Sequence, residues 1–425
     1  MIDRRQLVIG ATMFPVAARA VAAGASVTAE AEADLGRYID FGIKASGGPG
    51  DNASGAWMAN ELEKAGYRVE RQTIEVPFFD VSTAELRVGG HRADVLPQAV
   101  VVPTGPGGVE GALVRIDPRF ATPIPAGSIA VLELPFRRWS TVTVPLVRNA
   151  LLAAERSGAV AAIIVTTGPT GGAIVLNAPA DKPVVRIPVA CLAPQDAEPL
   201  LRACLSGAKG RLVVDGKGGR RKAFNVLGTL SRNAAKWIVV STPRSGWLTC
   251  AGERGPGIVT WLDLARWAPA ALPGVNLMFT SNSGHEYENA GSEELVRSHA
   301  PAPVDVALWL HLGAGFAARD WQEFGGKLRP LASADPQRLC VATDATAAAA
   351  MVAFAGLVGL DQPIVSDEMR MGETGTIVAA GYQNTIGLLG AHRFHHHRDD
   401  DRRCVDTGLI APVTAACRKL LSAAA

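Results

Sequence analysis

The sequence predicts an α/β protein: a mixed but mostly parallel sheet sandwiched by helices, with a β-rich segment inserted into it. Two patterns carry this prediction. After residue 223, strand-like apolar runs alternate with helix-like runs, as in parallel sheets whose strands are joined by crossover helices. Residues 93–216 instead hold short β-runs punctuated by glycine and proline. A composition of 48% hydrophobic and 19% charged residues is that of a well-packed globular protein.

The N-terminus has the features of an export signal. Arg4 and Arg5 precede an apolar run of small residues over 8–23, and alanines at its end offer cleavage sites. The run is too short and too broken to span a membrane. We therefore expect residues 1–28 to be a twin-arginine-type signal and the mature protein to be periplasmic. The alternative is a first helix that carries two arginines by chance.

The chain from residue 29 is expected to begin with two helices, over 29–40 and 55–66, and to enter a strand after Gly66. The turn sequence of residues 49–55 precedes the second helix, and Asp51 is expected to cap it.

The inserted segment is expected to be non-catalytic, because it contains almost no histidine, cysteine or acidic cluster with metal-ligand spacing. One helix is expected over 147–157. The expected strands are 99–102, 112–116, 129–134, 160–166, 184–189 and 210–214.

The last part of the chain supplies the expected sheet and its candidate chemistry. Strands are expected at 236–241, 275–280, 304–312 and 384–389, and helices at 257–267, 292–298, 345–359 and 409–421. Open α/β sheets place their functional groups at the carboxyl ends of the strands. Here those ends, or the loops after them, carry Glu253, His285-Glu286, His311 and His395. Taken alone, His285-Glu286 is more typical of a solvated loop before a helix. Together, the residues suit a metal cluster.

Several function classes are disfavoured. The net charge of +2 and the lack of a basic stripe do not indicate a nucleic-acid-binding surface. No P-loop, GxSxG or HExxH motif is present. The six cysteines are scattered without a CxxC pair, which predicts ordinary buried thiols and leaves room for one disulfide. His396, His397 and the mixed-charge run over 398–403 are expected to be solvated.

The chain resembles the co-catalytic zinc aminopeptidase superfamily, which includes glutaminyl cyclases. The resemblance covers residues 29–92 and 217–425, and the insert over 93–216 resembles a protease-associated domain in its GSIAVLEL, ERSGAVAAIIV and RIPVACLAPQDAEPLL stretches. The family's His-x-Asp-Ser aligns with Thr242-Pro-Arg244-Ser245, and its metal-bridging Asp aligns with Glu253. Threonine is a poor zinc ligand and Arg244 places a cation where the family has an acid, so a two-zinc site is not expected.

The remaining family positions keep part of the site. The Glu-Glu pair, base then ligand, aligns with His285-Glu286, and a ligand Asp aligns with His311. The H-x-x-x-D loop aligns with His395 and Asp399. The resemblance thus implies one zinc ion held by Glu253, Glu286 and His395 with His311 near it, and His285 as the base.

The implied function is hydrolysis of a peptide or small amide. Arg244 would orient substrate or stabilise the oxyanion, with Asp399 as a further substrate-binding residue, or Arg244 would pair with Glu253 or Glu286 and fill the empty metal position. The alternative is a catalytically inactive pseudo-peptidase that binds peptides or proteins.

Overall fold

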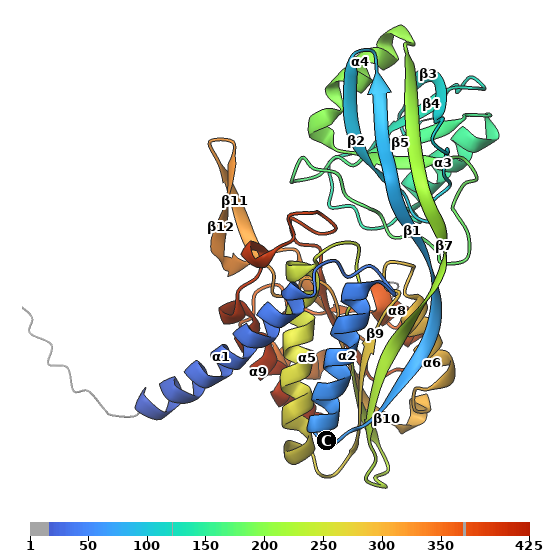
Figure 1. The fold of residues 1–425 in the computed structure, drawn as a ribbon. Helices are drawn as coiled ribbons and strands as arrows, with labels where there is room; N and C mark the ends of the chain where they lie inside the picture. Colours follow the sequence, from blue (N-terminus) through green and yellow to red (C-terminus); the bar gives the residue numbers. More distant parts are fainter. Residues whose placement is uncertain (1–16, 121, 369–370) are drawn as a thin grey trace, which may run out of the picture.

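The computed structural model describes residues 17–120, 122–368 and 371–425. Most of its strands pair within one large sheet (Figure 1). The long strands β1 (Arg68–Val88) and β7 (Lys209–Leu230) pair antiparallel along almost their whole length. They extend from the helix-covered half of the molecule into the insert (Figure 1). The strand order is β1-β2-β6-β5-β4-β3-β7-β9-β8-β10-β15-β13-β14.

The half of the sheet beyond β7 is mixed and mostly parallel, as the sequence predicts. The neighbours β9, β8, β10 and β15 are mutually parallel, whereas β7 and β13 join them antiparallel. Their apolar residues form a fully buried centre, as expected for a sheet covered on both faces. The strands are β8 (Trp237–Pro243), β9 (Asn276–Asn282), β10 (Val306–Leu312), β13 (Arg338–Ala342), β14 (Ile364–Val365) and β15 (Thr385–Gly390).

Helices pack on this half of the sheet. On one side α1, α2, α5 and α9 lie together around Trp261 and Leu35 in the largest core (Figure 1). A smaller cluster around Trp309 and Leu295 packs the other face with α6 and α8. The helices are α1 (Ala17–Asp40), α2 (Pro49–Lys64), α5 (Ala251–Ala271), α6 (Ala290–Ser298), α7 (Ala347–Ala353), α8 (Gly372–Ala379) and α9 (Thr407–Ala424).

The insert has its own apolar cores on both faces of its strands, one built around Ile164 and one around Ile163. Its elements are β2 (His91–Pro97), β3 (Val109–Ile116), β4 (Ile129–Glu133), α3 (Pro145–Arg156), β5 (Ala161–Val165), β6 (Val189–Leu192) and α4 (Glu198–Ser206). Two sequence expectations fail: residues 99–102 form no strand, and 184–188 are irregular up to the start of β6. Prolines at 183 and 188 remove donors that a strand would need.

Other boundaries also differ. The helix α5 begins at Ala251, six residues before its expected start, and so takes Glu253 into its first turn. A hairpin of β11 (Arg319–Phe324) and β12 (Lys327–Ala334) was not expected. All six cysteines lie in the described part of the chain and are free. The arginine pair of the expected signal lies outside the described residues. No helix within the described ranges is long and apolar enough to cross a membrane.

Candidate active site at the ends of the parallel strands

The predicted convergence at the strand ends is present in the sheet itself. His311 near the end of β10 stands in register with Ser241 of β8 on one side and Gly387 of β15 on the other. The next strand, β9, leads through Gly284, whose φ of +76° suits glycine, into His285 and Glu286. These polar groups therefore share one edge of the sheet.

Glu253 and Arg254 sit side by side in the first turn of α5, and both are buried. The Arg254 guanidinium lies 2.8 Å from Glu253 Oε1 in an ion pair, and its Nε–H donates to the carbonyl of Ser245 at 2.8 Å. Neither Glu253 oxygen accepts a well-aligned hydrogen bond from any described residue. Burial opposes ionisation of Glu253, but Arg254 and the nearby histidines outweigh it, and its pKa is held well below the ordinary value.

His395 and His396 complete a three-residue group with Glu253. One ligand atom from each lies within 4.8 Å of the others, and all three residues are buried. The two imidazoles stack with centroids 4.0 Å apart, and His396 Nδ1 donates a hydrogen bond to the carbonyl of Val175 at 2.8 Å. The pKa of His395 lies well below the usual range, mainly because the ring is buried and secondly because His396 is adjacent. His395 is therefore a neutral imidazole with a free lone pair.

This group fits a divalent metal. His396 Nε2 lies 3.5 Å from Glu253 Oε1, too long for a good hydrogen bond and close to the ~3.3 Å between two atoms on one tetrahedral zinc ion. His395 Nδ1 and both Glu253 oxygens lack hydrogen-bond partners among the described residues. Buried polar atoms are nearly always satisfied, so such atoms call for a further ligand. Imidazole and carboxylate are zinc ligands.

The second group at this edge is centred on Glu373, a buried carboxylate from α8. Its Oε1 lies 3.1 Å from His285 Nδ1 and its Oε2 accepts from Asn282 at 2.9 Å. His311 Nδ1 is 3.9 Å from Oε2 and 2.9 Å from Ser241 Oγ. Burial opposes ionisation, but the bond from His285 and the two histidines outweigh it and lower the pKa of Glu373. Burial lowers the pKa of His311 to about 4.

Two of the sequence-predicted ligands do not join the metal group. Glu286 Oε1 accepts from the backbone N–H of Ser46 at 2.8 Å, and its Oε2 accepts from Ser245 Oγ at 2.7 Å. Both oxygens are therefore engaged by neutral donors. His311 belongs to the Glu373 group. Of the predicted four-residue set, the structure brings together Glu253 and His395 and adds His396.

Arg244 is placed differently from its expected role. The side chain is fully buried, and its Nε lies 3.0 Å from Asp51 Oδ1 in an ion pair. A nitrogen of the guanidinium also donates to the carbonyl of Ser281 at 2.7 Å, and the group lies over the ring of Phe224. A Cβ at Gly55 would come within 2.8 Å of it, so no substrate can reach it from that side. Its carboxylate partner is Asp51, and not Glu253 or Glu286.

Asp51 is not the expected helix cap, because α2 already begins at Pro49, within the stretch expected to be a turn, and its N-cap is Gly48. It lies in the first turn of α2, where one carboxylate oxygen accepts from the backbone of Gly47 at 2.7 Å and from Ser283 Oγ at 2.6 Å. Asp51 and Arg244 thus tie α2 to the ends of β8 and β9. This ion pair occupies the region where the family resemblance places an acidic motif.

The insert covers this edge of the sheet. Ser140 Oγ lies 3.4 Å from His395 Nε2, and the Val175 carbonyl accepts from His396. Asn177 accepts from the indole N–H of Trp247, and the backbone N–H of Ala178 donates to the carbonyl of Glu286. The candidate metal group is therefore enclosed jointly by the α/β half and the insert.

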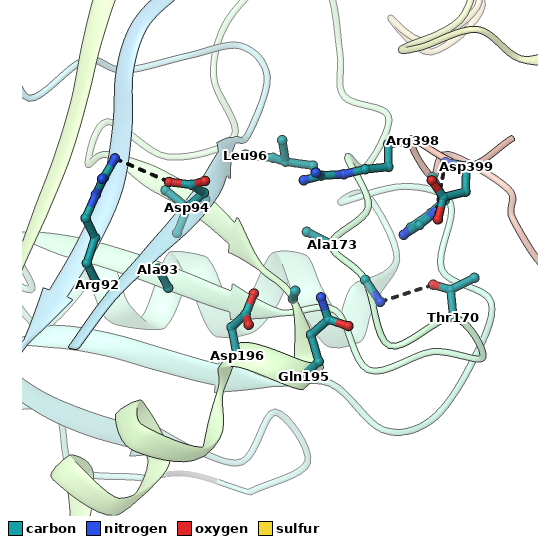
Figure 2. A pocket seen from close by; sticks show the side chains of 14 residues that line it. Arg92, Ala93, Asp94, Leu96, Thr170, Ala173, Gln195, Asp196, Arg398 and Asp399 are labelled. Carbon is teal, nitrogen blue, oxygen red and sulfur yellow. Dashed lines mark hydrogen bonds and ion pairs between the residues drawn. The ribbon is translucent and has the colours of Figure 1, made fainter. Parts of the chain in front are cut away.

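Asp399, a predicted substrate-binding residue, lines a cleft of about 500 Å³ between the insert and the loop after β15. Figure 2 shows Asp399 and Arg398 together on one wall of the cleft. The insert supplies the other wall with Asp94, Leu96, Gln195 and Asp196. His397, predicted from the sequence to be solvated, is 5% exposed and also lines this cleft. His396 and Asp400 are buried as well, which corrects the same expectation for both of them.

His396, Glu373 and Arg254 belong to the site but were not predicted from the sequence. His396 was visible as one of four histidines within residues 392–397, which is half of the eight in the chain. Arg254 adjoins the aligned Glu253. Glu373 has no motif spacing of its own, and only the packing of α8 against β15 brings it to the histidines.

No protein-family model and no curated protein matches the sequence. Solved structures do match it. A zinc aminopeptidase from Bacillus subtilis aligns over 93% of this chain and 94% of its own with a TM-score of 0.72 and 14% identity. An aminopeptidase from Aneurinibacillus sp. strain AM-1 aligns over 93% and 94% with a TM-score of 0.67 and 15% identity. A peptidase M28 precursor from Shewanella amazonensis aligns over 94% and 95% with a TM-score of 0.68 and 15% identity.

These likenesses define the class: the chain has the zinc aminopeptidase fold. At 14% identity, the Bacillus subtilis enzyme shares its fold with this chain.

Proposed function

We propose that the protein hydrolyses peptide or related amide bonds, using one metal ion held by Glu253, His395 and His396. The observation that carries this proposal is the group of buried ligand atoms without well-aligned hydrogen bonds at the strand ends of an aminopeptidase fold. Zinc in such a site supplies Lewis acidity and lowers the pKa of bound water. Three protein ligands leave a coordination position for water or substrate.

His285 is the proposed general base. An ionised Glu373 can only accept a hydrogen bond, so Nδ1 of His285 carries a hydrogen and Nε2 is the ring nitrogen that would take up a proton. The backbone N–H of His285 donates to Ser245 Oγ at 3.3 Å, and the carbonyl of Ser245 accepts from Arg254, which contacts Glu253. Three contacts thus connect the base to the metal group. Arg254 also keeps Glu253 ionised, which is the form that binds metal.

Substrate would enter from the cleft that contains Asp399. The cleft presents carboxylates and guanidinium groups within one space, so it can hold the two charged ends of a short peptide. We keep Asp399 as a substrate-binding residue on this basis. Arg244 has no such access, and its proposed role is to hold α2 against the strand ends.

A second candidate function is a peptide-binding pseudo-peptidase. The buried ion pairs Arg244–Asp51 and Arg254–Glu253 both place an arginine against a carboxylate at this edge. A guanidinium beside Glu253 can satisfy its charge without a metal. This candidate predicts a protein that folds without metal and binds peptides in the Asp399 cleft without cleaving them.

Metal content and hydrolysis together decide between the two candidates. The purified protein should retain zinc on the Glu253 site after desalting and should release amines from aminoacyl amides. Glu253→Gln and His395→Ala should lose both properties, whereas His299→Ala, a partly exposed histidine away from the site, should keep both. Metal bound by Glu253→Gln as tightly as by the wild type would contradict the proposed site. Peptide binding without turnover or metal would establish the pseudo-peptidase.

Export and the identity of the insert are further parts of the proposal. Arg4-Arg5 and the small apolar run support periplasmic delivery, and the β-rich composition of residues 93–216 supports a protease-associated-like insert. Replacing both arginines with lysine should retain the protein in the cytoplasm, as measured by cell fractionation. Delivery at the wild-type level would contradict the signal.

A further inference from the structure

A further group of side chains of metal-ligating types, separate from the Glu253 and Glu373 groups, lies beside the proposed active site. It shares no residue with that site. His392, Asp400 and Cys404 each place a ligand atom within 4.8 Å of the others, and all three are buried. They come from the loop between β15 and α9, in which Cys404 ends a short 3-10 turn. The rings of His392 and His395 are 6.2 Å apart between centroids.

Neither ring nitrogen of the buried His392 side chain makes a well-aligned hydrogen bond, and its one ion-pair partner among the described residues is Asp400. Its Nε2 is 3.4 Å from Asp400 Oδ2, longer than a good N–H···O bond. That separation matches the ~3.3 Å between two ligand atoms on a tetrahedral zinc ion. A buried unsatisfied polar group costs about 1–3 kcal/mol, so a missing partner is indicated.

Backbone hydrogen bonds fix the Asp400 carboxylate and still leave lone pairs with which it could bind a metal ion. Its Oδ1 accepts from the backbone N–H of Gly252 at 2.6 Å, and its Oδ2 accepts from that of Glu253 at 3.0 Å. An ionised carboxylate has about four lone-pair sites, so two remain. Backbone donors of this kind fix the orientation of a metal-ligating carboxylate.

The backbone of α5 leaves room where the three side chains meet. A Cβ at Gly252 would lie 2.9 Å from Asp400 Oδ1, from the Cβ of Cys404 and from Cε1 of His392. The three side chains therefore converge on a glycine that no larger residue could replace without displacing them.

We propose that His392, Asp400 and Cys404 bind a zinc-type divalent ion at a second site, which fastens the histidine-rich loop to the start of α5. Thiolate and imidazole select zinc and related transition metals over magnesium or calcium. On binding, the Cys404 Sγ–H bond is replaced by an Sγ–metal bond and the proton leaves to solvent. The weak donation from Sγ to the carbonyl of Asp399, at 3.3 Å, is lost in exchange.

The test counts metal in the full-length protein, purified under reducing conditions, loaded with zinc and desalted. Cys404→Ala should hold about one equivalent less zinc than the wild type, the load of one such site. The matched control is Cys340→Ala, which removes another fully buried thiol and should leave the metal content unchanged. Equal metal content in Cys404→Ala and wild type would overturn the proposal.

Cobalt(II) loading provides a readout that does not depend on a folded Cys404 variant. The wild type should show a thiolate-to-cobalt charge-transfer absorption, and Glu253→Gln should keep it because Glu253 belongs to the other site. Cobalt-loaded wild type without this absorption would overturn the second site. If Glu253→Gln loses metal and Cys404→Ala does not, the second site is overturned and the proposed active site is supported. The two proposals therefore fail separately.

Discussion

The Glu253 group and the Glu373 group lie at the same sheet edge, and each contains one buried glutamate and two histidines, yet their hydrogen bonds are satisfied to different degrees. Both oxygens of Glu253 and Nδ1 of His395 lack hydrogen-bond partners among the described residues. In contrast, Glu373 is hydrogen-bonded through one oxygen to His285 and through the other to Asn282. A carboxylate–histidine group with free lone pairs is suited to bind a metal, and one with its lone pairs engaged is suited to orient a base.

The difference follows from which neighbours each group has. The neighbours of Glu253 are a guanidinium and two imidazoles, which contact it without well-aligned hydrogen bonds. Glu373 faces Asn282 and His285, whose N–H groups point at it. Residue type alone thus does not separate a metal ligand from a positioning residue, whereas hydrogen-bond satisfaction does.

The largest expected effect breaks the Glu253 group. Glu253→Gln should lose its metal and lower kcat/KM by about a thousandfold or more, since a Lewis acid supplies several kcal/mol of transition-state stabilisation. Metal analysis and amide hydrolysis measure this. The matched control is Glu286→Gln, a buried glutamate at the same edge whose oxygens face neutral donors. If Glu286→Gln loses the metal, the ligand set is the one expected from sequence.

The second effect tests the Glu373 group through pH. His311 has a folded-state pKa of about 4 against an ordinary value of 6.5, so the unfolded chain binds its proton first as pH falls. This neutral histidine therefore contributes stability above about pH 6.5 that is lost as pH falls towards 4, by up to about 3 kcal/mol. His311→Asn should show a flatter stability profile in urea denaturation across this window. An unchanged slope, matching that of His299→Asn, would contradict the assignment.

The third effect distinguishes orienting a base from binding a metal. Glu373→Gln should lower kcat about tenfold to a hundredfold, the usual range for a partner that orients a functional histidine. Its zinc content and KM should match the wild type, because no metal ligand or cleft residue changes. Glu368→Gln, an exposed carboxylate before the same helix, is the control. Loss of zinc in Glu373→Gln would merge the two groups into one metal site.

The smallest effect lies outside both groups, in the cleft. Asp399 is half exposed, so its replacement by Asn should raise KM by up to about fivefold, the range for an exposed charge pair, with kcat and zinc unchanged. Asp401→Asn, whose carboxylate pairs with Arg403 and does not line the cleft, should behave as wild type. Equal KM values for the two variants would remove Asp399 from substrate binding.

Much of the fold could be predicted because its signals are local. The alternating apolar runs that become β8, β9, β10 and β15 each carry their own strand pattern, and connections between parallel strands leave few arrangements. The boundaries were less certain: the start of α5 at Ala251 depends on Asp400 accepting from the first turn of that helix. That contact spans 148 positions of sequence and leaves no local pattern.

The sequence by itself determined the α/β class and the candidacy of Glu253 and His395. Only the tertiary structure decided that His396 joins them, that Glu286 is engaged by Ser46 and Ser245, and that Arg244 is paired with Asp51. The physical reason is that strand and helix patterns act over a few residues, whereas the partners of a buried charge are chosen by packing between distant segments.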